Sequence, residues 1–113
     1  MNCSIVFYPL FEREAKRLAK HYPSFKEDLI NLIKELRANP YSGVEIAHGL
    51  RKVRMAIKSK GKGKSGGARV ITMIVSIEDD DLKLGLQYIY DKSSRSNISD
   101  SEIRRILKSN GII

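Results

Sequence analysis

The order of apolar and polar positions in the first forty residues predicts one short strand followed by two helices. β-Branched and aromatic residues fill Ser4 to Tyr8, as in a strand, and Pro9 ends that run. From Leu10 to Tyr22, apolar residues recur at the spacing of one helical face, namely Phe11, Ala15, Leu18, Ala19 and Tyr22.

A second helix is expected after Pro23, from Ser24 to about Ala38. Ser24 and Glu27 have the spacing of a capping box, in which the serine accepts from a backbone N–H and the glutamate reaches back. The expected buried stripe consists of Phe25, Leu29, Leu32, Ile33 and Leu36. The tight proline turn between the two helices predicts an antiparallel helical hairpin.

Period-two alternation predicts strands in the second half of the chain, after a loop from 41 to 49 with a short extended piece at Val44 to Ile46. In Arg51 to Lys58, Val53, Met55 and Ile57 should face one way and Lys52, Arg54 and Lys58 the other. Arg69 to Ile77 is apolar nearly throughout, as in a central, covered strand. Leu82 to Asp91 should place Leu82, Leu84, Leu86, Tyr88 and Tyr90 on one face.

A last helix is predicted from a second capping box, Ser99 to Glu102, to about Ser109, before Asn110-Gly111. Ile98 and Ile103 are placed as a hydrophobic staple. The expected order is β-α-α-β-β-β-α, an α+β fold in which an antiparallel sheet packs on the helical hairpin and a C-terminal helix follows. Residues 1–113 are expected to form a single domain.

Charge, hydropathy and cysteine content narrow the expected partners and compartment of the protein. The chain has 21 Lys and Arg against 13 Asp and Glu, a net charge of +8. No apolar stretch approaches the ~20 residues that span a bilayer, and the apolar run at the N-terminus breaks at Glu12, which argues against a signal peptide. The single cysteine, Cys3, suits a reducing compartment, so we expect a cytoplasmic protein without a membrane partner.

The positive charge is concentrated in one stretch, Arg51 to Arg69, called here the basic window. It has no acidic residue and eight basic ones, Arg51, Lys52, Arg54, Lys58, Lys60, Lys62, Lys64 and Arg69. Its first half reads as a strand and its second half is rich in glycine, so charge lies on a strand face and on a loop beside it. Such a concentration indicates a polyanionic partner, most often nucleic acid.

Three basic side chains form the sharpest candidate site. Lys52 and Arg54 share one strand face, and Arg69 opens the strand expected to pair with it, so the three can converge on one phosphate. The alternative is surface charge without a role, against which the basic window offers no acidic partner. Near the end of the last strand, Tyr90 and Lys92 could stack on a base and donate a proton, whereas Tyr90 could equally be a core residue.

Other familiar sites are not supported. The run 61–65 lacks the first glycine of a phosphate-binding P-loop, since Lys58 occupies that position. His21, His48 and Cys3 have no metal-site spacing. The sequence has no serine–histidine–aspartate pattern and no carboxylate pair suited to hydrolysis, so no cofactor or metal is expected.

The central residues resemble the RelE/HigB-type toxins of bacterial type II toxin–antitoxin systems, in the RelE/ParE superfamily. The resemblance rests on GLRKVRMAI at 49–57, KSKGKGKSGGARVI at 58–71 and IYDKS at 89–93, followed by a serine-capped helix. The element order fits as well, so the resemblance covers nearly the whole chain and implies the RelE-like fold.

The resemblance implies a ribosome-dependent mRNA endonuclease that cuts the codon in the ribosomal A site. The RNA's own 2′-OH is the nucleophile, and basic residues stabilise the charged phosphorane. By position, the implied catalytic residues are Lys52, Arg54, Arg69, Tyr90 and Lys92, the last standing where some members have a histidine. The implied RNA-binding residues are Arg51, Lys58, Lys60, Lys62, Lys64 and Arg95.

Two other functions stay open at this point. One is the gyrase-inhibiting branch of the same superfamily, represented by ParE, against which the basic strand and glycine-rich loop argue. The other is a non-catalytic RNA- or ribosome-binding inhibitor of translation. The implied partners are the ribosome, mRNA and a cognate antitoxin, acidic or amphipathic, that masks the basic face or displaces the last helix.

Overall fold

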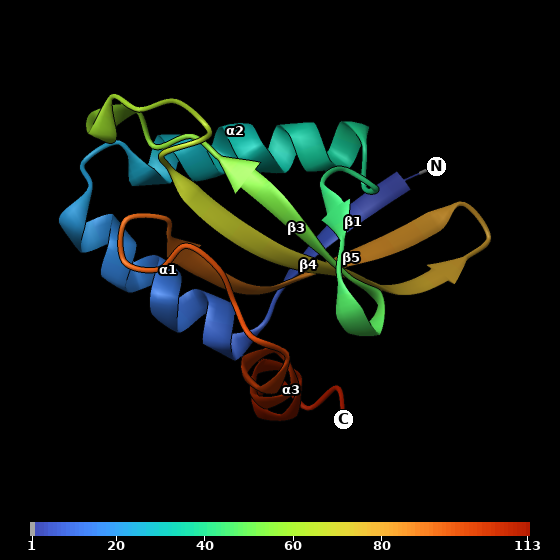
Figure 1. The fold of residues 1–113 in the computed structure, drawn as a ribbon. Helices are drawn as coiled ribbons and strands as arrows, with labels where there is room; N and C mark the ends of the chain where they lie inside the picture. The colour runs from blue at the N-terminus through green and yellow to red at the C-terminus, as the bar shows by residue number, and fades with distance from the viewer. Residues whose placement is uncertain (1) are drawn as a thin grey trace.

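The computed structural model describes residues 2–113 and is built on a five-stranded sheet with strand order β1-β5-β4-β3-β2 (Figure 1). In chain order the elements are β1 (Asn2–Phe7), α1 (Pro9–His21), α2 (Phe25–Ala38), β2 (Val44–Glu45), β3 (Leu50–Met55), β4 (Ala68–Glu78), β5 (Asp81–Asp91) and α3 (Asp100–Ser109). Short 3₁₀ turns cover Ala47–Gly49 and Lys58–Lys60. The predicted α+β class is confirmed.

The sheet is mixed. Strands β3, β4 and β5 form the antiparallel meander expected from their short connections. Strand β1 instead runs parallel to β5, with Ile5 opposite Leu84. The prediction of a purely antiparallel sheet was therefore wrong. A parallel neighbour requires a long connection, and here everything between β1 and β5 supplies it.

Helices α1 and α2 cover one face of the sheet, as the hairpin prediction required (Figure 1). Phe11 of α1 and Phe25 and Leu36 of α2 are almost fully buried against strand residues such as Met55 and Leu84. Burying each such side chain contributes about 1.5–3 kcal/mol. The predicted stripe of α2 is confirmed for Phe25, Leu32 and Leu36, while Leu29 and Ile33 are only partly buried.

A β-bulge in β5 changes which face the last residues of that strand occupy. Ile71 pairs with Tyr88 and Thr72 pairs with Leu86, so Gln87 is the extra residue. Leu82, Leu84 and Leu86 therefore face the helical hairpin, whereas Tyr88 and Tyr90 face the other side. The prediction that these five residues share a face was wrong, because uninterrupted alternation cannot anticipate a bulge.

Helix α3 packs on the face opposite the hairpin. Its Ile103 and Leu107 form a second apolar cluster with Leu50, Ile71 and Tyr90 of the sheet. The predicted capping box is confirmed, since the Ser99 side chain accepts from the Glu102 amide and the Glu102 side chain accepts from the Ser99 amide. Ile98 packs against the same cluster, as a staple would.

The other predicted capping box is absent. Ser24 has helical backbone angles, and its side chain makes no capping bond to α2. Its hydroxyl instead donates to the Asp28 carboxylate at 2.6 Å and accepts from the Ser59 amide at 2.9 Å. A tertiary contact with the 3₁₀ turn thus replaces the local cap, which sequence spacing alone does not reveal.

The strand of the basic window is shorter than the expected 51–58, since β3 ends at Met55. Its apolar face is nonetheless as predicted, with Val53, Met55 and the following Ile57 all buried. The extended piece expected near Val44 is β2, which pairs with residues 51 and 52. Among the helices of residues 2–113, none combines the length and apolar character needed to cross a membrane.

Candidate nucleic-acid interface

A groove of about 590 Å³ lies beside β3, and five of its eleven lining residues are basic. Its five basic side chains come from β3, the glycine-rich loop, the start of β4 and the residue after β5, and they are Lys52, Arg54, Lys64, Arg69 and Lys92. Glu35 of α2 is the single acidic residue in the lining that residues 2–113 provide. We call this hollow the basic groove.

Strand register explains why these side chains meet. Arg54 lies directly opposite Arg69 in the antiparallel pair of β3 and β4. Lys52, two residues before Arg54, projects from the same face of β3. Lys92 follows β5, and its amide donates to the Gly67 carbonyl at 3.0 Å, which brings it beside the loop. The structure thus brings together four of the five proposed catalytic residues.

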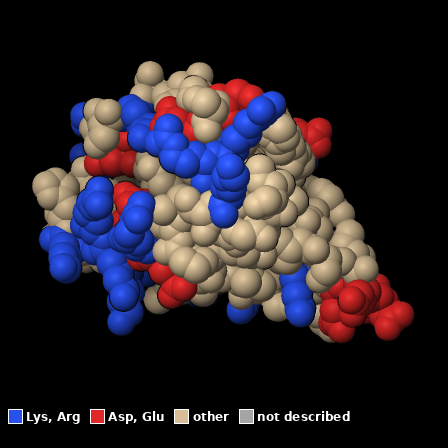
Figure 2. All heavy atoms as spheres, turned by 90° about the horizontal axis from the view of Figure 1, so that it is seen from below, with Lys and Arg blue, Asp and Glu red and all other residues tan. Residues whose placement is uncertain are grey.

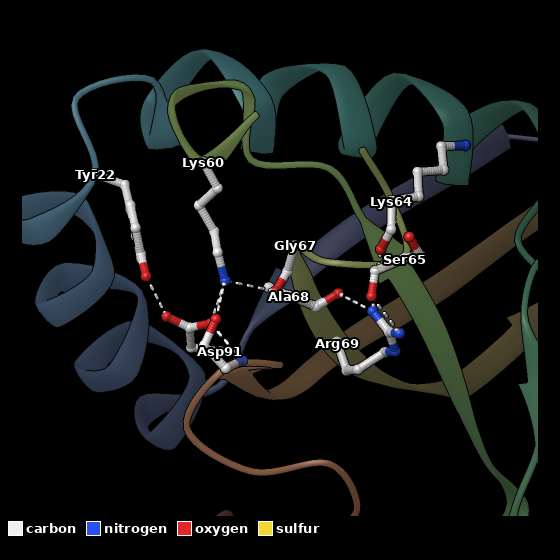
Figure 3. A network of polar contacts seen from close by, with 9 residues as sticks. Tyr22, Lys60, Lys64, Ser65, Gly67, Ala68, Arg69 and Asp91 are labelled. Carbon is white, nitrogen blue, oxygen red and sulfur yellow. Dashed lines mark hydrogen bonds and ion pairs between the residues drawn. The ribbon is translucent and has the colours of Figure 1, made fainter. Parts of the chain in front are cut away.

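Arg69 is buried, with 6% of its surface exposed, and its guanidinium holds the glycine-rich loop (Figure 3). Nη1 donates to the carbonyls of Lys64 and Ala68, and Nη2 to that of Ser65, each at 3.1 Å. The loop passes so close to β3 that a Cβ at Gly67 would lie 2.0 Å from the Met55 carbonyl oxygen. Arg69 is therefore held rigidly at the groove wall.

Of the five groove cations, Lys64 pairs with Glu35, whereas the other four have no acidic partner within residues 2–113. In the part of the chain that the structure describes, no acidic side chain forms an ion pair with Lys52, Arg54, Arg69 or Lys92. Like charges directly opposite each other in a sheet are destabilising. A bound anion would relieve the repulsion between Arg54 and Arg69, so the arrangement favours a phosphate at this point.

The basic side chains on one face of the surface lie apart from the acidic turn between β4 and β5. Figure 2 shows Lys and Arg side chains gathered in groups on the face that it presents, with some acidic side chains among them and a compact acidic group at the far right. That side is where β4 and β5 join in Figure 1, at the acidic residues 78–81. The acidic turn therefore does not screen the basic side chains.

We predict that Arg54→Ala separates function from stability. Arg54 is exposed and forms no ion pair within residues 2–113, so removing it relieves repulsion by Arg69 and leaves the free energy of unfolding unchanged or up to about 1 kcal/mol higher. If the groove acts on RNA, cleavage should fall by about 10²-fold. Urea denaturation and a cleavage assay measure both effects. Lys83→Ala, the same charge change on β5 outside the groove, should alter neither.

Tyr90 lies outside the groove lining, in the cluster beneath α3. Only 5% of its surface is exposed, and its hydroxyl has no hydrogen-bond partner within residues 2–113. Burial raises the pKa of Tyr90, and the nearby Arg69 and Arg95 charges oppose this rise. Tyr90 is thus a core residue that lies directly opposite Arg69 across β4 and β5, beside the groove but not in its lining.

Lys60 is engaged elsewhere (Figure 3). Its ammonium is buried and bonds the Asp91 carboxylate at 2.5 Å and the Ser93 hydroxyl at 2.7 Å, while Tyr22 donates to the other Asp91 oxygen. Burial favours a higher pKa for Asp91, but the hydrogen bonds from Lys60, Tyr22 and the Ser93 amide outweigh it and lower that pKa to about 2. We therefore assign Lys60 to folding and omit it from the interface.

The other proposed RNA-binding residues lie around the groove. Arg51 projects from the opposite face of β3 and bonds the carbonyls of Ser42 and Gly43, so it anchors the loop before β3. Lys58 is exposed and pairs with Glu27 at 3.7 Å. Lys62 is exposed on the loop.

Arg95 does not line the basic groove. Its guanidinium pairs with Glu102 and lies 6.0 and 5.7 Å from the ring centroids of Tyr88 and Tyr90. It therefore fastens the loop after β5 to α3, and the structure does not bring it to the basic groove.

Sequence reasoning missed Glu35, which reaches the groove from α2 and pairs with Lys64 at 3.4 Å. The available signal was weak, since Glu35 looks like any exposed helix residue. Within residues 2–113, no three His, Cys, Asp or Glu side chains gather in a way that could hold a metal ion. No protein-family model matches the chain.

Proposed function

We propose that this protein is an endoribonuclease toxin of the RelE/HigB type, which cuts mRNA in the ribosomal A site. The observation that carries the proposal is the cross-strand pair of Arg54 and Arg69, flanked by Lys52 and Lys92 and free of acidic partners in residues 2–113. Cations without acidic partners repel one another and so lower the stability of the fold. The same cations would stabilise the negatively charged transition state of phosphodiester cleavage. The mixed sheet with two helices on one face and one on the other is compatible with a RelE-like fold.

The groove suits a reaction in which RNA supplies the nucleophile. The 2′-oxygen attacks the adjacent phosphorus, the bond from phosphorus to the 5′-oxygen breaks, and the products are a 2′,3′-cyclic phosphate and a 5′-hydroxyl. Arg54 and Arg69 would stabilise the extra charge of the phosphorane. Lys52 and Lys92 line the same groove and would assist the two proton transfers, while Lys64 would bind a phosphate of the RNA backbone.

The proposed partners follow from the same surface. Ribosomal and messenger RNA are polyanions that the net charge of +8 attracts. A cognate antitoxin with acidic segments would inhibit the protein by covering the basic groove. An antitoxin that displaced α3 would disturb the cluster around Tyr90 instead.

Mapping of 5′ ends on a reporter mRNA, with and without translating ribosomes, tests the proposal. We expect cuts within codons, in frame, only when ribosomes are present, and their loss with Arg54→Ala. Halted translation without cuts would identify a binding inhibitor instead. Translation that continues unaffected would contradict both and direct attention to inhibition of gyrase.

A further inference from the structure

A second hollow, of about 190 Å³, adjoins the basic groove where β3 ends beside α2. Glu35, Arg54 and Lys64 line both hollows, so the two meet at the Arg54 side chain. The second hollow also contains Asn31 and Asp28 of α2 and the residue Ala56 after β3. We call it the side pocket.

The side pocket differs chemically from the basic groove. Asn31 and Glu35 are four residues apart on α2, so their amide and carboxylate project from one helical face. Asp28 is buried, and its Oδ2 accepts from the Ser24 hydroxyl at 2.6 Å and from the Lys58 amide at 3.0 Å. That carboxylate shapes the wall. Beside the cations Arg54, Lys58 and Lys64 of the lining, Glu35 and Asn31 are then the side chains able to accept a hydrogen bond from a ligand.

A carboxylate in this position selects what can enter. Glu35 repels a phosphate, so a strand held at Arg54 would turn a base, and not its backbone, toward the side pocket. A carboxylate is purely an acceptor and pairs with the exocyclic amino groups of cytosine, adenine or guanine. Uracil carries a carbonyl oxygen in place of that amino group, and its one donor at this edge, the ring N3–H, is flanked by two carbonyl oxygens that repel a carboxylate. An unpaired base can be read in this way along its Watson–Crick edge.

The ion pair between Glu35 and Lys64 holds the Glu35 carboxylate only weakly. The two charged atoms are 3.4 Å apart, and more than half of each side chain is exposed. Exposed pairs of this kind are weak and separate easily. Backbone phosphate would attract Lys64, whose carbonyl stays bound to Arg69, and Glu35 would then be free to accept from a base.

We propose that Glu35, assisted by Asn31, reads one base of the bound RNA and selects those that carry an exocyclic amino group over uracil. The inference rests on the proposed function in that RNA is taken as the ligand of the basic groove. It adds a specificity-determining residue on α2, outside the basic strands that bind the phosphates.

Fluorescence anisotropy with hexamers of uridine, cytidine and adenosine tests this subsite without requiring cleavage. We expect wild-type protein to bind the cytidine or the adenosine hexamer at least about fivefold more tightly than the uridine hexamer. In Glu35→Gln, whose amide can both donate and accept, this ratio should fall below about twofold. Glu12→Gln removes the same charge from the exposed side of α1, outside both hollows, and should keep the ratio.

Two results would overturn the subsite. If Glu35→Gln strengthens binding of all three hexamers by one common factor, the carboxylate only repels RNA and reads nothing. If wild-type protein binds none of them, the subsite and RNA binding fail together. A changed ratio in a protein that does not cut mRNA would leave the subsite standing and refute the nuclease. If the protein cleaves mRNA, Glu35→Gln should cut codons that carry uracil at the position that Glu35 reads, which the wild type disfavours.

Discussion

Replacing Arg69 with alanine is expected to lower RNA cleavage by at least about 10²–10³-fold, the largest loss of any single change in the groove. Arg69 is nearly buried, faces Arg54 across the strands and fixes three loop carbonyls, so it cannot be replaced by a mobile cation. Arg69→Lys keeps the charge but lacks the planar fork and should not restore activity. Single-turnover cleavage on programmed ribosomes measures the effect.

The same variants separate an enzyme from a binding inhibitor. An enzyme that loses Arg69 should still associate with ribosomes, because Lys52, Lys64 and Lys92 keep their charges in the groove. Lys83→Ala removes an exposed charge from β5 outside the groove and serves as the control. Near-normal cleavage by Arg69→Lys would contradict a bidentate role. A proportional loss of affinity and cleavage would mean that Arg69 only binds.

The core of the candidate site was predictable because it depends on period-two geometry. The alternation in the basic window placed Lys52 and Arg54 on one face, and the short connection to the next strand placed Arg69 opposite them. The cap at Ser99 was predictable for a similar reason, since a capping box is complete within four residues. Local rules of this kind depend on nothing distant in the chain.

What the sequence could not reveal depends on contacts between distant segments. The bulge at Gln87 shifts the register of β5 against β4, so Tyr90 turns under α3, opposite Arg69 and on the same face of the sheet. Lys60 looked like its basic neighbours until Asp91, 31 positions later, came within 2.5 Å of it. Glu35 enters the site only because α2 lies along the end of β3. None of these pairings leaves a spacing in the sequence.

The lysines and arginines of the basic window thus divide into two kinds. Lys60 is buried with a carboxylate, a hydroxyl and an aromatic ring as neighbours, which is how a structural charge is accommodated. Arg54 and Arg69 face each other with no acidic partner in residues 2–113. Compensated charges hold a fold together, whereas uncompensated ones indicate a ligand that supplies the missing charge.

The buried pair of Lys60 and Asp91 gives the largest expected effect on stability. Asp91→Asn should lower the free energy of unfolding by about 3–5 kcal/mol, because it leaves the Lys60 ammonium buried without its counter-charge. The double variant Lys60→Met with Asp91→Asn should recover most of that loss. Urea denaturation with an unchanged m-value is the measurement. Glu27→Gln, at an exposed pair with Lys58, should change stability by less than about 0.5 kcal/mol.

The ion pair of Lys60 and Asp91 should also make the free energy of unfolding depend on pH. The folded pKa of Asp91 is about 2, below its ordinary value of 3.8, so the folded protein releases this proton more readily than the unfolded chain. The resulting stabilisation, about 2.5 kcal/mol, is complete above about pH 5 and is lost as the pH falls toward 2. Asp91→Asn should show a correspondingly flatter decline between pH 5 and pH 2. Parallel declines in the two proteins would mean that other carboxylates govern acid unfolding and that the pair contributes little.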